Sequence, residues 1–437
     1  MVFADDARLS SMTDLETERR VSRDRARQRR GRAGEPTENP VDEADDDRTV
    51  RRRGVLLYSV ATVLFIVGLG VLGWKGYQTS LDIKGGNSLN AVSDPTKPGY
   101  EAQVRPTPTH LLINTDGNGK VVDLELLVEG ADSKGGAVIF IPGVMVVESD
   151  GGAQNLTKLA ETKGIPSMLD SLQRVLGVGI GDAATVSPTQ LEQLLTPAGP
   201  LTFENPDALL RTSGTAQKEI VFPAGQITVA PADAAEYLSF VNKGESEVNR
   251  TSRAKVFWDA WVKTLAEKGD AAAPKVAPFP SASGDGKVDL ATVISQFGAG
   301  VTSTQQLPLE AVPVPGAGVT VYRGDRAGID ALLPKLIPFP ASAYPGQRPR
   351  VSLLNGTTDT SAALRAATPV VEAGAQITVL GNASNFHVSR TTIEYHDPAK
   401  ADAAKAIATK LGVGPPVAGN QSDALDITVT IGADYQP

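Results

Sequence analysis

The sequence has 437 residues, which is long enough for two or three domains with cores of their own. Its formal net charge is -8 at pH 7 and its pI is about 5.2. This balance argues against nucleic acid as the main partner, because neutralising phosphates requires a concentrated basic face. The chain contains no cysteine, so disulfides and thiolate metal sites are excluded.

Residues 1–53 are predicted to form a disordered tail. They contain 13 Arg and 13 Asp or Glu, few apolar residues and no sustained hydrophobic period. The charges are segregated, because a basic stretch at 19–32 is followed by an acidic one at 41–47 and by three arginines at 51–53. One interpretation is a regulated or partner-binding cytoplasmic tail. The simpler one, which we favour, is a solvated tail that carries a topology signal.

The uncharged stretch GVLLYSVATVLFIVGLGVLGW, residues 54–74, predicts a transmembrane helix that we place at 54–76. At a rise of about 1.5 Å per residue, this length crosses a hydrocarbon core of about 30 Å. The stretch is too long, and too far from the N-terminus, for an ordinary cleaved signal peptide, which indicates a signal anchor. Since three arginines precede it, the positive-inside rule predicts a single-pass cell-membrane protein with a cytoplasmic N-terminus and extracytoplasmic C-terminal domains.

Two breaks divide the rest of the chain. Residues 77–105 are polar and rich in Gly, Pro, Ser and Asn, which predicts a linker. The stretch 341–349, which contains AYPGQRP, predicts a second linker. These breaks define a large module at 106–340 and a small module at 350–435.

The large module alternates strand and helix signals, which is the order of an α/β layered domain. Ser187 is predicted to cap a helix that has Pro188 in its first turn. The aromatic stripe within 251–266 is more typical of a core than of a cofactor site. The strands are predicted at 110–116, 121–130 and 137–142, the helices at 166–177 and 251–266, and a strand that passes into a helix at 184–195.

Few motifs in the chain carry chemistry. No phosphate-binding P-loop and no G-x-S-x-G nucleophile elbow is present, and LGVGIGD at 176–182 reads as a helix end and a turn. His387 and His396 lie nine residues apart without the further close ligands that zinc requires, so we expect exposed or hydrogen-bonding histidines. The stretch GESEVNRTSR, 244–253, holds the charged side chains that are the best candidates for ligand binding, and it allows two interpretations.

In the first interpretation, Arg250 and Arg253 bind a phosphate. Their i, i+3 spacing places both guanidinium groups on one face near the positive end of a helix. In the second interpretation, the nearby Glu245 and Glu247 form ion pairs with these arginines. The residues alone favour neither.

The order of these segments resembles the LytR-CpsA-Psr domain. Members of this family transfer glycopolymers from polyprenyl-pyrophosphate carriers to the cell wall, and in them the domain follows a membrane anchor. VVDL at 121–124 and IPGV at 141–144 stand where the family has strand-end Arg-Ser-Asp-Thr and Ile-Pro-Arg-Asp motifs. GESEVNRTSRAKVF resembles the family's segment with two arginines, and the stretch from residue 287 to residue 338 resembles its last part. The resemblance implies that strand-end arginines and aspartates hold the pyrophosphate and a divalent metal.

This chain departs from the family pattern at several of these positions. Gly143 and Val144 replace the Arg and Asp of the Ile-Pro motif, and Val121 replaces the first Arg. Three residues are kept and become the candidate phosphate-binding residues, namely Asp123, Arg250 and Arg253, with Asp123 as the candidate metal ligand. A single carboxylate holds magnesium poorly. The resemblance therefore predicts a degenerate member, with magnesium as a cofactor only if the protein is catalytically active.

The small module resembles the LytR C-terminal domain, a companion of these proteins in actinobacteria. RVSLLNGTTDT at 350–360 has the family's opening strand and Asn-Gly-Thr turn, and DITVTIGADY at 426–435 has its closing pattern.

Two functions remain open at this point. The first is an envelope-facing protein that binds a polyprenyl-(pyro)phosphate lipid or a cell-wall glycan with weak or no transferase activity. The second is an active phosphotransferase that attaches glycopolymers to peptidoglycan. Both functions imply a membrane location, with envelope proteins as further candidate partners. The lost arginines favour the first function, binding without transfer.

Overall fold

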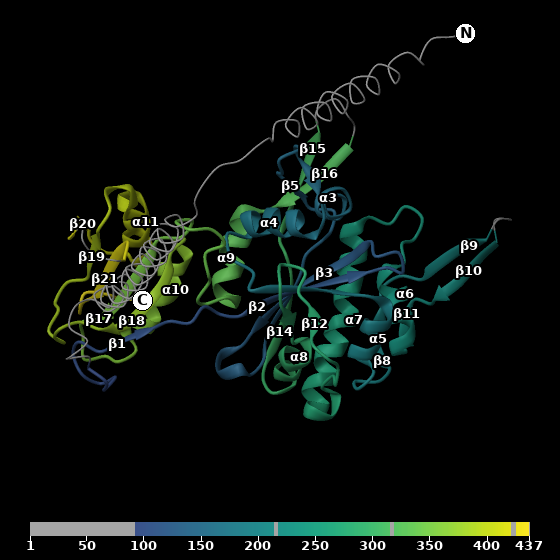
Figure 1. Cartoon of the computed structure of the whole chain (residues 1–437), viewed down its shortest axis with the longest axis horizontal. Coiled ribbons are helices and arrows are strands. Elements are labelled where there is room, and N and C mark those ends of the chain that lie inside the picture. The colour runs from purple at the N-terminus through teal and green to yellow at the C-terminus, as the bar shows by residue number, and fades with distance from the viewer. Residues whose placement is uncertain (1–91, 214–216, 315–318, 421–424, 437) are drawn as a thin grey trace, which may run out of the picture. The chain divides into compact units, whose positions relative to one another are not determined.

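The computed structural model describes residues 92–213, 217–314, 319–420 and 425–436. The predicted tail at 1–53 and the predicted transmembrane helix at 54–76 lie outside them. Within the described ranges, no helix has both the length and the apolar character that a membrane crossing requires. These ranges form a large mixed α/β domain and a smaller α/β domain that follows it in the chain, as the sequence predicts (Figure 1).

A five-stranded mixed sheet forms the centre of the large domain, with the strand order β14-β4-β3-β2-β7. The three middle strands are antiparallel neighbours, and the two outer strands pair in parallel. The middle strands are the three predicted from apolar runs, and they are buried because helices cover both faces. The bounds are Thr109–Thr115 for β2, Val121–Glu129 for β3, Gly136–Phe140 for β4, Asp182–Val186 for β7 and Thr302–Gln306 for β14.

Helices pack on both faces of this sheet (Figure 1). One core lies between the sheet and α5, α6, α7 and α8, and it contains the aromatic stripe of α7 with Phe257, Trp258 and Trp261. The other core lies between the sheet and α3, α4 and α9. The bounds are Leu156–Lys163 for α3, Ile165–Leu176 for α4, Pro188–Leu195 for α5, Ala234–Ser239 for α6, Glu247–Lys268 for α7, Leu290–Gly298 for α8 and Arg326–Leu336 for α9.

Two-stranded antiparallel sheets and, among the described residues, three 3-10 turns complete the large domain, and the sequence signals did not separate them from loops. The paired strands are β5 (Val146–Val147) with β6 (Gln154–Asn155), β8 (Leu201–Asn205) with β11 (Gly225–Val229), β9 (Leu209–Ser213) with β10 (Gln217–Phe222), β12 (Phe279–Pro280) with β13 (Lys287–Val288), and β15 (Leu309–Val314) with β16 (Val319–Gly324). The 3-10 turns are η2 (Ala131–Ser133), η3 (Pro231–Asp233) and η4 (Gly269–Ala272).

Local sequence signals set several helix ends. Ser187 caps α5 in a reciprocal pair with Gln190, and Pro188 is the first residue of the helix, as predicted. Gly177 ends α4 in the left-handed conformation at φ 68°, which confirms the interpretation of LGVGIGD as a helix end. The aromatic helix starts earlier than predicted, because the Ser246 side chain accepts a hydrogen bond from the Asn249 amide and caps α7.

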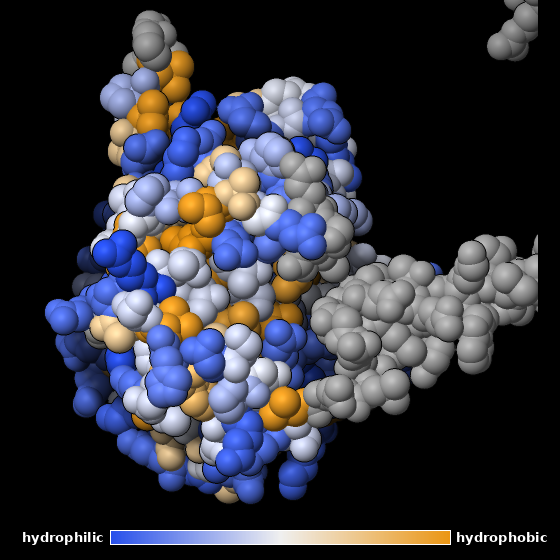
Figure 2. All heavy atoms as spheres, turned by 90° about the vertical axis from the view of Figure 1, so that its left-hand side faces the viewer, coloured by the Kyte–Doolittle hydropathy of each residue, from blue (hydrophilic) through white to orange (hydrophobic). Residues whose placement is uncertain are grey.

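The C-terminal domain is a six-stranded sheet, in the order β1-β18-β17-β21-β19-β20, against which α10 and α11 pack around one core. Its surface is mixed, and the face in Figure 2 shows hydrophilic side chains interspersed with smaller hydrophobic areas. The bounds are Arg350–Asn355 for β17, Ala362–Glu372 for α10, Gln376–Asn382 for β18, Thr392–Tyr395 for β19, Pro398–Lys400 for η5, Ala401–Leu411 for α11, Val417–Ala418 for β20 and Ile427–Ile431 for β21.

Both segments expected to be linkers make ordered contacts. The end of 77–105 forms β1 (Glu101–Gln103), which pairs with β18 at the edge of the C-terminal sheet. In the second segment, Arg348 donates from Nε to the Gly177 carbonyl at 2.7 Å and from Nη1 to the Ala375 carbonyl at 3.1 Å. Since these carbonyls lie just beyond the C-termini of α4 and α10, their partial negative charge stabilises the guanidinium group.

Candidate functional site

The three candidate residues meet at one place between β3 and the start of α7. Asp123 lies on β3, and strand alternation places its side chain on the same face as Leu127, which packs in the core that contains α7. Arg250 and Arg253 project from the first turns of α7. All three side chains are buried, with relative exposures of 2–3%. The structure therefore brings the predicted residues together, but inside the domain.

Arg250 has all of its donors engaged by the protein itself. Its Nη1 lies 3.2 Å from Asp123 Oδ1 and donates to the Leu238 carbonyl at 2.7 Å. Its Nη2 donates to the Val122 carbonyl at 2.6 Å, and both Nε and Nη2 lie 2.8 Å from Glu247 Oε2. A guanidinium group has five N–H donors, and these contacts account for each.

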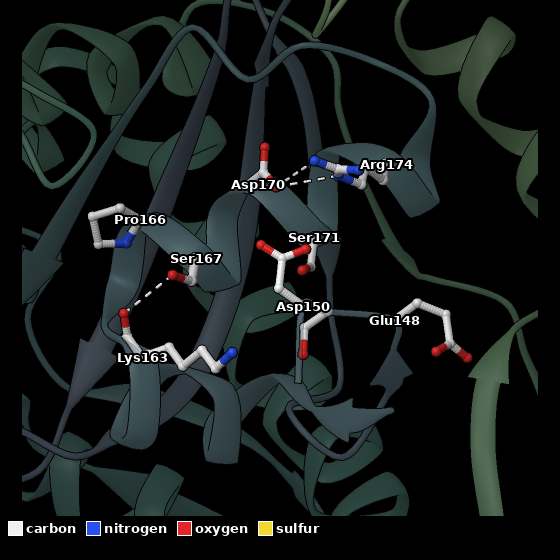
Figure 3. Close-up of a pocket in the computed structure, with 9 residues that line it drawn as sticks. Glu148, Asp150, Lys163, Pro166, Ser167, Asp170, Ser171 and Arg174 are labelled. Atoms are coloured by element: carbon white, nitrogen blue, oxygen red, sulfur yellow. Dashed lines mark hydrogen bonds and ion pairs between the residues drawn. The ribbon is translucent and has the colours of Figure 1, made fainter. Parts of the chain in front are cut away.

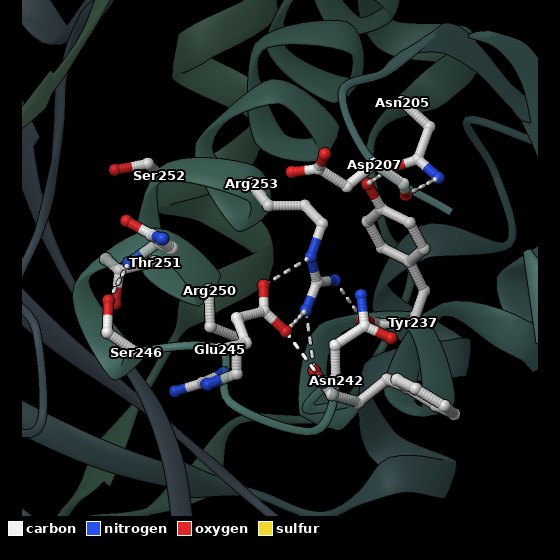
Figure 4. A network of polar contacts seen from close by, with 12 residues as sticks. Asn205, Asp207, Tyr237, Asn242, Glu245, Ser246, Arg250, Thr251, Ser252 and Arg253 are labelled. Atoms are coloured by element: carbon white, nitrogen blue, oxygen red, sulfur yellow. Dashed lines mark hydrogen bonds and ion pairs between the residues drawn. The ribbon is translucent and has the colours of Figure 1, made fainter. Parts of the chain in front are cut away.

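Arg253 is held in a similar way (Figure 4). Its Nε donates to Glu245 Oε1 at 3.2 Å, and its Nη1 and Nη2 donate to the carbonyls of Tyr237 and Phe240 at 2.9 and 2.6 Å. The guanidinium carbon lies 5.2 Å from the centre of the Tyr237 ring. Figure 4 shows the Glu245 and Arg253 side chains pointing toward each other, so the ion-pair interpretation of GESEVNRTSR is the one that the contacts support.

A second acid, Glu125, lies two residues along β3 on the same face and is 1% exposed. Its Oε2 accepts a hydrogen bond from Asn114 Nδ2 at 2.9 Å. Burial raises the pKa of Glu125 well above its ordinary value, and the charge of Asp123 raises it further. Burial also raises the pKa of Asp123 to about 6, although the Arg250 charge acts in the opposite direction. The cluster therefore favours a protonated Glu125 and one ion pair.

Several polar atoms around this pair have no partner among the described residues. They include Asn114 Oδ1 and Asp123 Oδ2 on the neighbouring strands β2 and β3, and the indole nitrogens of Trp258 and Trp261 on α7. Unsatisfied buried groups of this kind cost about 1–3 kcal/mol each. The cluster is therefore polar, and the protein's own groups satisfy it only in part.

The strand end after β4 carries no charged group. Gly143 and Val144 occupy the positions at which the family resemblance expects Arg and Asp. A Cβ atom placed on Gly143 lies 2.6 Å from Thr157 Cγ2, so the turn is packed against α3. Larger side chains enter this turn only if Thr157 moves.

Magnesium does not fit the residues that the structure gathers here. Among the described residues, no group of three or more His, Asp or Glu side chains could hold a metal ion. The one free acceptor of the candidate ligand, Asp123 Oδ2, belongs to a carboxylate that is already paired with a guanidinium group. Magnesium requires near-octahedral oxygen ligands and normally shares them with substrate phosphates.

A separate polar pocket of about 450 Å³ lies between the β5–β6 hairpin and α4 (Figure 3). Asp170 and Arg174 form an i, i+4 ion pair at its edge, and Asp170 also accepts a hydrogen bond from the Tyr344 hydroxyl. Lys163 and Asp150 line it as well, without an ion pair among the described residues. None of its lining residues is one that the family resemblance indicates.

The sequence interpretation missed Asn114, Glu125 and Trp258. Glu125 lies inside an otherwise apolar strand, LELLV at 124–128, and a lone acid in such a run was the available signal. The histidines behave as expected. The His396 ring is hydrogen-bonded to the Asn420 carbonyl and Thr428 Oγ1, and His387 is exposed.

The comparisons with known proteins identify the C-terminal part. Residues 348–435 match a family model described as LytR cell envelope-related transcriptional attenuator. This domain is therefore a LytR C-terminal domain, as the sequence predicted. No curated protein matches the chain.

Several solved structures are similar to this chain at low sequence identity. TagV from B. subtilis is 12% identical, with a TM-score of 0.41, over 53% of this chain and 96% of its own. TagT from B. subtilis is 14% identical, with a TM-score of 0.40, over 56% and 92%. A LytR-Csp2A-Psr enzyme from Actinomyces oris is 18% identical, with a TM-score of 0.38, over 55% and 96%. TagT has also been solved bound to LIIa-WTA.

Proposed function

We propose that this chain is a membrane-anchored, extracytoplasmic cell-envelope protein whose LytR-CpsA-Psr-like domain has lost transferase activity. It binds a polyprenyl-(pyro)phosphate lipid or a cell-wall glycan without transferring it. The LytR C-terminal domain supports an envelope role, and the uncharged stretch at 54–74 supports the anchor.

One observation supports the proposed loss of transferase activity. Arg250 is buried, and its five donors contact Asp123, Glu247 and two carbonyl groups of the protein itself. A transferase must stabilise the charge that develops on the leaving phosphate with groups that are free to meet it. Breaking the buried Asp123 pair to free Arg250 costs several kcal/mol.

Transfer would also need a metal ion and further cations, and the described residues around Asp123 and the β4 strand end offer no cluster of ligands for a metal ion. Gly143 and Val144 offer no charge at the strand end, and Asp123 is committed to Arg250. No step of a reaction is therefore assigned to magnesium in this protein.

The proposal is tested with the external part of the chain, residues 92–437. It is incubated with magnesium and a polyprenyl-pyrophosphate-linked glycan, and both binding and phosphate release are followed. Binding without turnover is the expected result. Efficient turnover would establish the alternative, an active phosphotransferase that attaches glycopolymers to peptidoglycan, and failure to bind either the lipid or a cell-wall glycan would refute the ligand part.

A further inference from the structure

The C-terminal sheet is completed by a strand that comes from the other side of the large domain in the sequence. β1 pairs antiparallel with β18, with Glu101 opposite Gly381, Ala102 opposite Leu380 and Gln103 opposite Val379. Backbone hydrogen bonds extend the pairing at both ends, from the Gly99 amide to the Ala383 carbonyl and from the Val104 amide to the Thr378 carbonyl, each at 2.9 Å. The matched family region, 348–435, does not include this strand.

Asn382, the last residue of β18, recognises the backbone of the incoming segment. Its amide nitrogen donates to the Tyr100 carbonyl at 2.7 Å. Its side-chain Nδ2 donates to the carbonyls of Pro95 and Lys97 at 2.9 and 2.8 Å. A single residue therefore fixes both the register of β1 and the turn that precedes it.

Gly381 provides the space for this segment. A Cβ atom on Gly381 lies 2.2 Å from the Tyr100 carbonyl oxygen and 3.0 Å from Glu101 Cα, so any side chain collides with the docked backbone. The φ of Gly381 is not in the left-handed region, which means that close approach rather than backbone conformation requires glycine here.

The segment is also fixed where it leaves the sheet. Val104 packs against the C-terminal core, and the Thr107 amide donates to the Phe339 carbonyl at 2.8 Å. Thr107 Oγ1 accepts a hydrogen bond from the Phe339 amide at 3.1 Å. The two ends of the large domain thus lie against each other, and Pro106 and Pro108 restrict the connection between them.

We propose that the edge of β18 is a receptor for an extended polypeptide strand, and that residues 92–104 are its built-in ligand. This gives the C-terminal domain a binding function of its own. Recognition by strand addition uses main-chain hydrogen bonds for affinity and side-chain positions for selectivity, and Asn382 and Gly381 supply the selectivity.

Docking of β1 limits how far the two domains can extend from the membrane, an effect that rests on the proposed anchor. With β1 docked, residues 77–91 separate the proposed anchor from the docked segment, and a fully extended tether of that length measures at most about 50 Å. With β1 released, the tether extends to residue 106 and its length is at most about 100 Å. Docking therefore halves the distance over which both domains can range.

Strand docking can be tested by disulfide trapping, because the chain has no cysteine of its own. Gln103 and Val379 are register partners, and opposed strand positions suit the 4.4–6.8 Å Cα separation that a disulfide requires. The full chain with Gln103→Cys and Val379→Cys should form an intrachain disulfide on mild oxidation. Gln103→Cys with Val417→Cys, on the far edge strand β20, should not. Absence of the first disulfide, or a disulfide between two chains, would overturn the proposal.

The role of Gly381 has a matched control in the same domain. A Cβ atom on Gly414 meets no atom within 4 Å, whereas one on Gly381 collides with β1. In the full chain, Gly381→Val should raise amide hydrogen exchange of residues 99–104 by about a hundredfold or more, which corresponds to an opening cost lowered by about 2.7 kcal/mol. Gly414→Val should leave this exchange unchanged. Equal exchange in the two variants would refute the receptor site.

The tether length is tested with the full chain in lipid nanodiscs. Leu364 is 60% exposed on α10, so Leu364→Cys offers a position for a fluorescent donor, with an acceptor on the lipid head groups. Energy transfer should fall in Gly381→Val and not in Gly414→Val. If the disulfide forms but no energy transfer is seen in any variant, the proposed membrane anchor is wrong, whereas the receptor site at β18 is still supported. If transfer is equal in all variants, the effect on reach is wrong.

Discussion

Asp123 and Arg250 form an ion pair of 3.2 Å that is buried on both sides, with side-chain exposures of 4% and 3%. One residue comes from the central strand β3 and the other from α7, so the pair ties the sheet to the helix that covers it. The residues that the family resemblance assigns to a phosphate and a metal thus neutralise each other. The pair links β3 to α7 inside the large domain.

The first prediction concerns the stability that this pair provides. Arg250→Ala leaves Asp123 and two backbone carbonyls buried without a partner, so the free energy of unfolding should fall by about 3–5 kcal/mol. Lys263→Ala, on the exposed face of the same helix, removes a surface pair with Glu267 and should cost less than about 1 kcal/mol. Urea denaturation of both variants measures the difference. Equal and small losses would contradict a structural role for Arg250.

The second prediction concerns pH and Glu125. Its pKa is raised in the folded protein, so the folded state binds more protons than the unfolded state above the ordinary pKa of a glutamate. The contribution of Glu125 to the free energy of unfolding is therefore fully present below about pH 4. It is lost as the pH rises, by up to about 1.4 kcal/mol per pH unit. Glu125→Gln cannot ionise and keeps an acceptor for Asn114. Its melting temperature should match the unaltered protein at pH 4.5 and exceed it at pH 8, whereas a constant difference would be inconsistent with a buried titrating acid.

The third prediction concerns His110, whose two ring nitrogens lie 2.7 Å from Asp182 and 2.9 Å from Glu129. Burial alone lowers the pKa of His110, but the hydrogen bonds and charges of these acids outweigh it and the pKa is raised. The resulting stability is complete below about pH 6.5 and is lost as the pH rises through the folded pKa. His110→Gln should therefore be less stable than the unaltered protein at pH 6, with a gap that narrows toward pH 9. A gap that widens instead would show that the imidazole is neutral.

The fourth prediction concerns the C-terminal domain alone. A fragment of residues 348–437 should unfold cooperatively, because the domain has its own core, but it exposes the edge of β18. A synthetic peptide of residues 92–106 should raise its melting temperature, and the same peptide should not stabilise the Gly381→Val fragment. Calorimetry of the four combinations checks this, and no effect of the peptide on the unaltered fragment would contradict it.

The fifth prediction concerns restoring charge at the strand end. Gly143→Arg with Val144→Asp should lower the melting temperature, since the new side chain collides with the Thr157 methyl group. Adding Thr157→Ser, which removes only that methyl group, should recover much of the loss. Neither variant should gain magnesium-dependent turnover, because Arg250 and Asp123 remain paired. A restored activity would mean that the two substitutions alone had disabled the site.

The sequence predicted the layered α/β class and the central strands because apolar runs and capping residues act locally. Leu111, Leu126 and Ile139 are buried where the runs placed them, and Ser187 caps its helix by itself. β1 could not be predicted in the same way. Its partner is almost 280 residues away, and a short polar strand at a sheet edge has no hydrophobic period to reveal it.

The candidate site shows the same limit. The spacing of Arg250 and Arg253 and the family resemblance at Asp123 selected three residues that lie close together in the structure, but burial decides whether charged groups face a ligand or each other. That burial depends on the packing of α7 against β3 and on Glu245 and Glu247 near the start of α7. Only the packed structure distinguishes a phosphate grip from an internal ion pair.

The most direct test of the account is a nitrogen-15 NMR measurement of the Nε–H groups of Arg250 and Arg253 in residues 92–437. Both groups belong to buried guanidinium side chains and donate to Glu247 and Glu245, so their signals should exchange slowly with water and stay unchanged when magnesium and a polyprenyl-pyrophosphate glycan are added. Assignment by Arg250→Lys and Arg253→Lys identifies each signal. Ligand-dependent shifts of both signals would contradict the central claim, because they would show that the two arginines leave their internal acids to hold a phosphate.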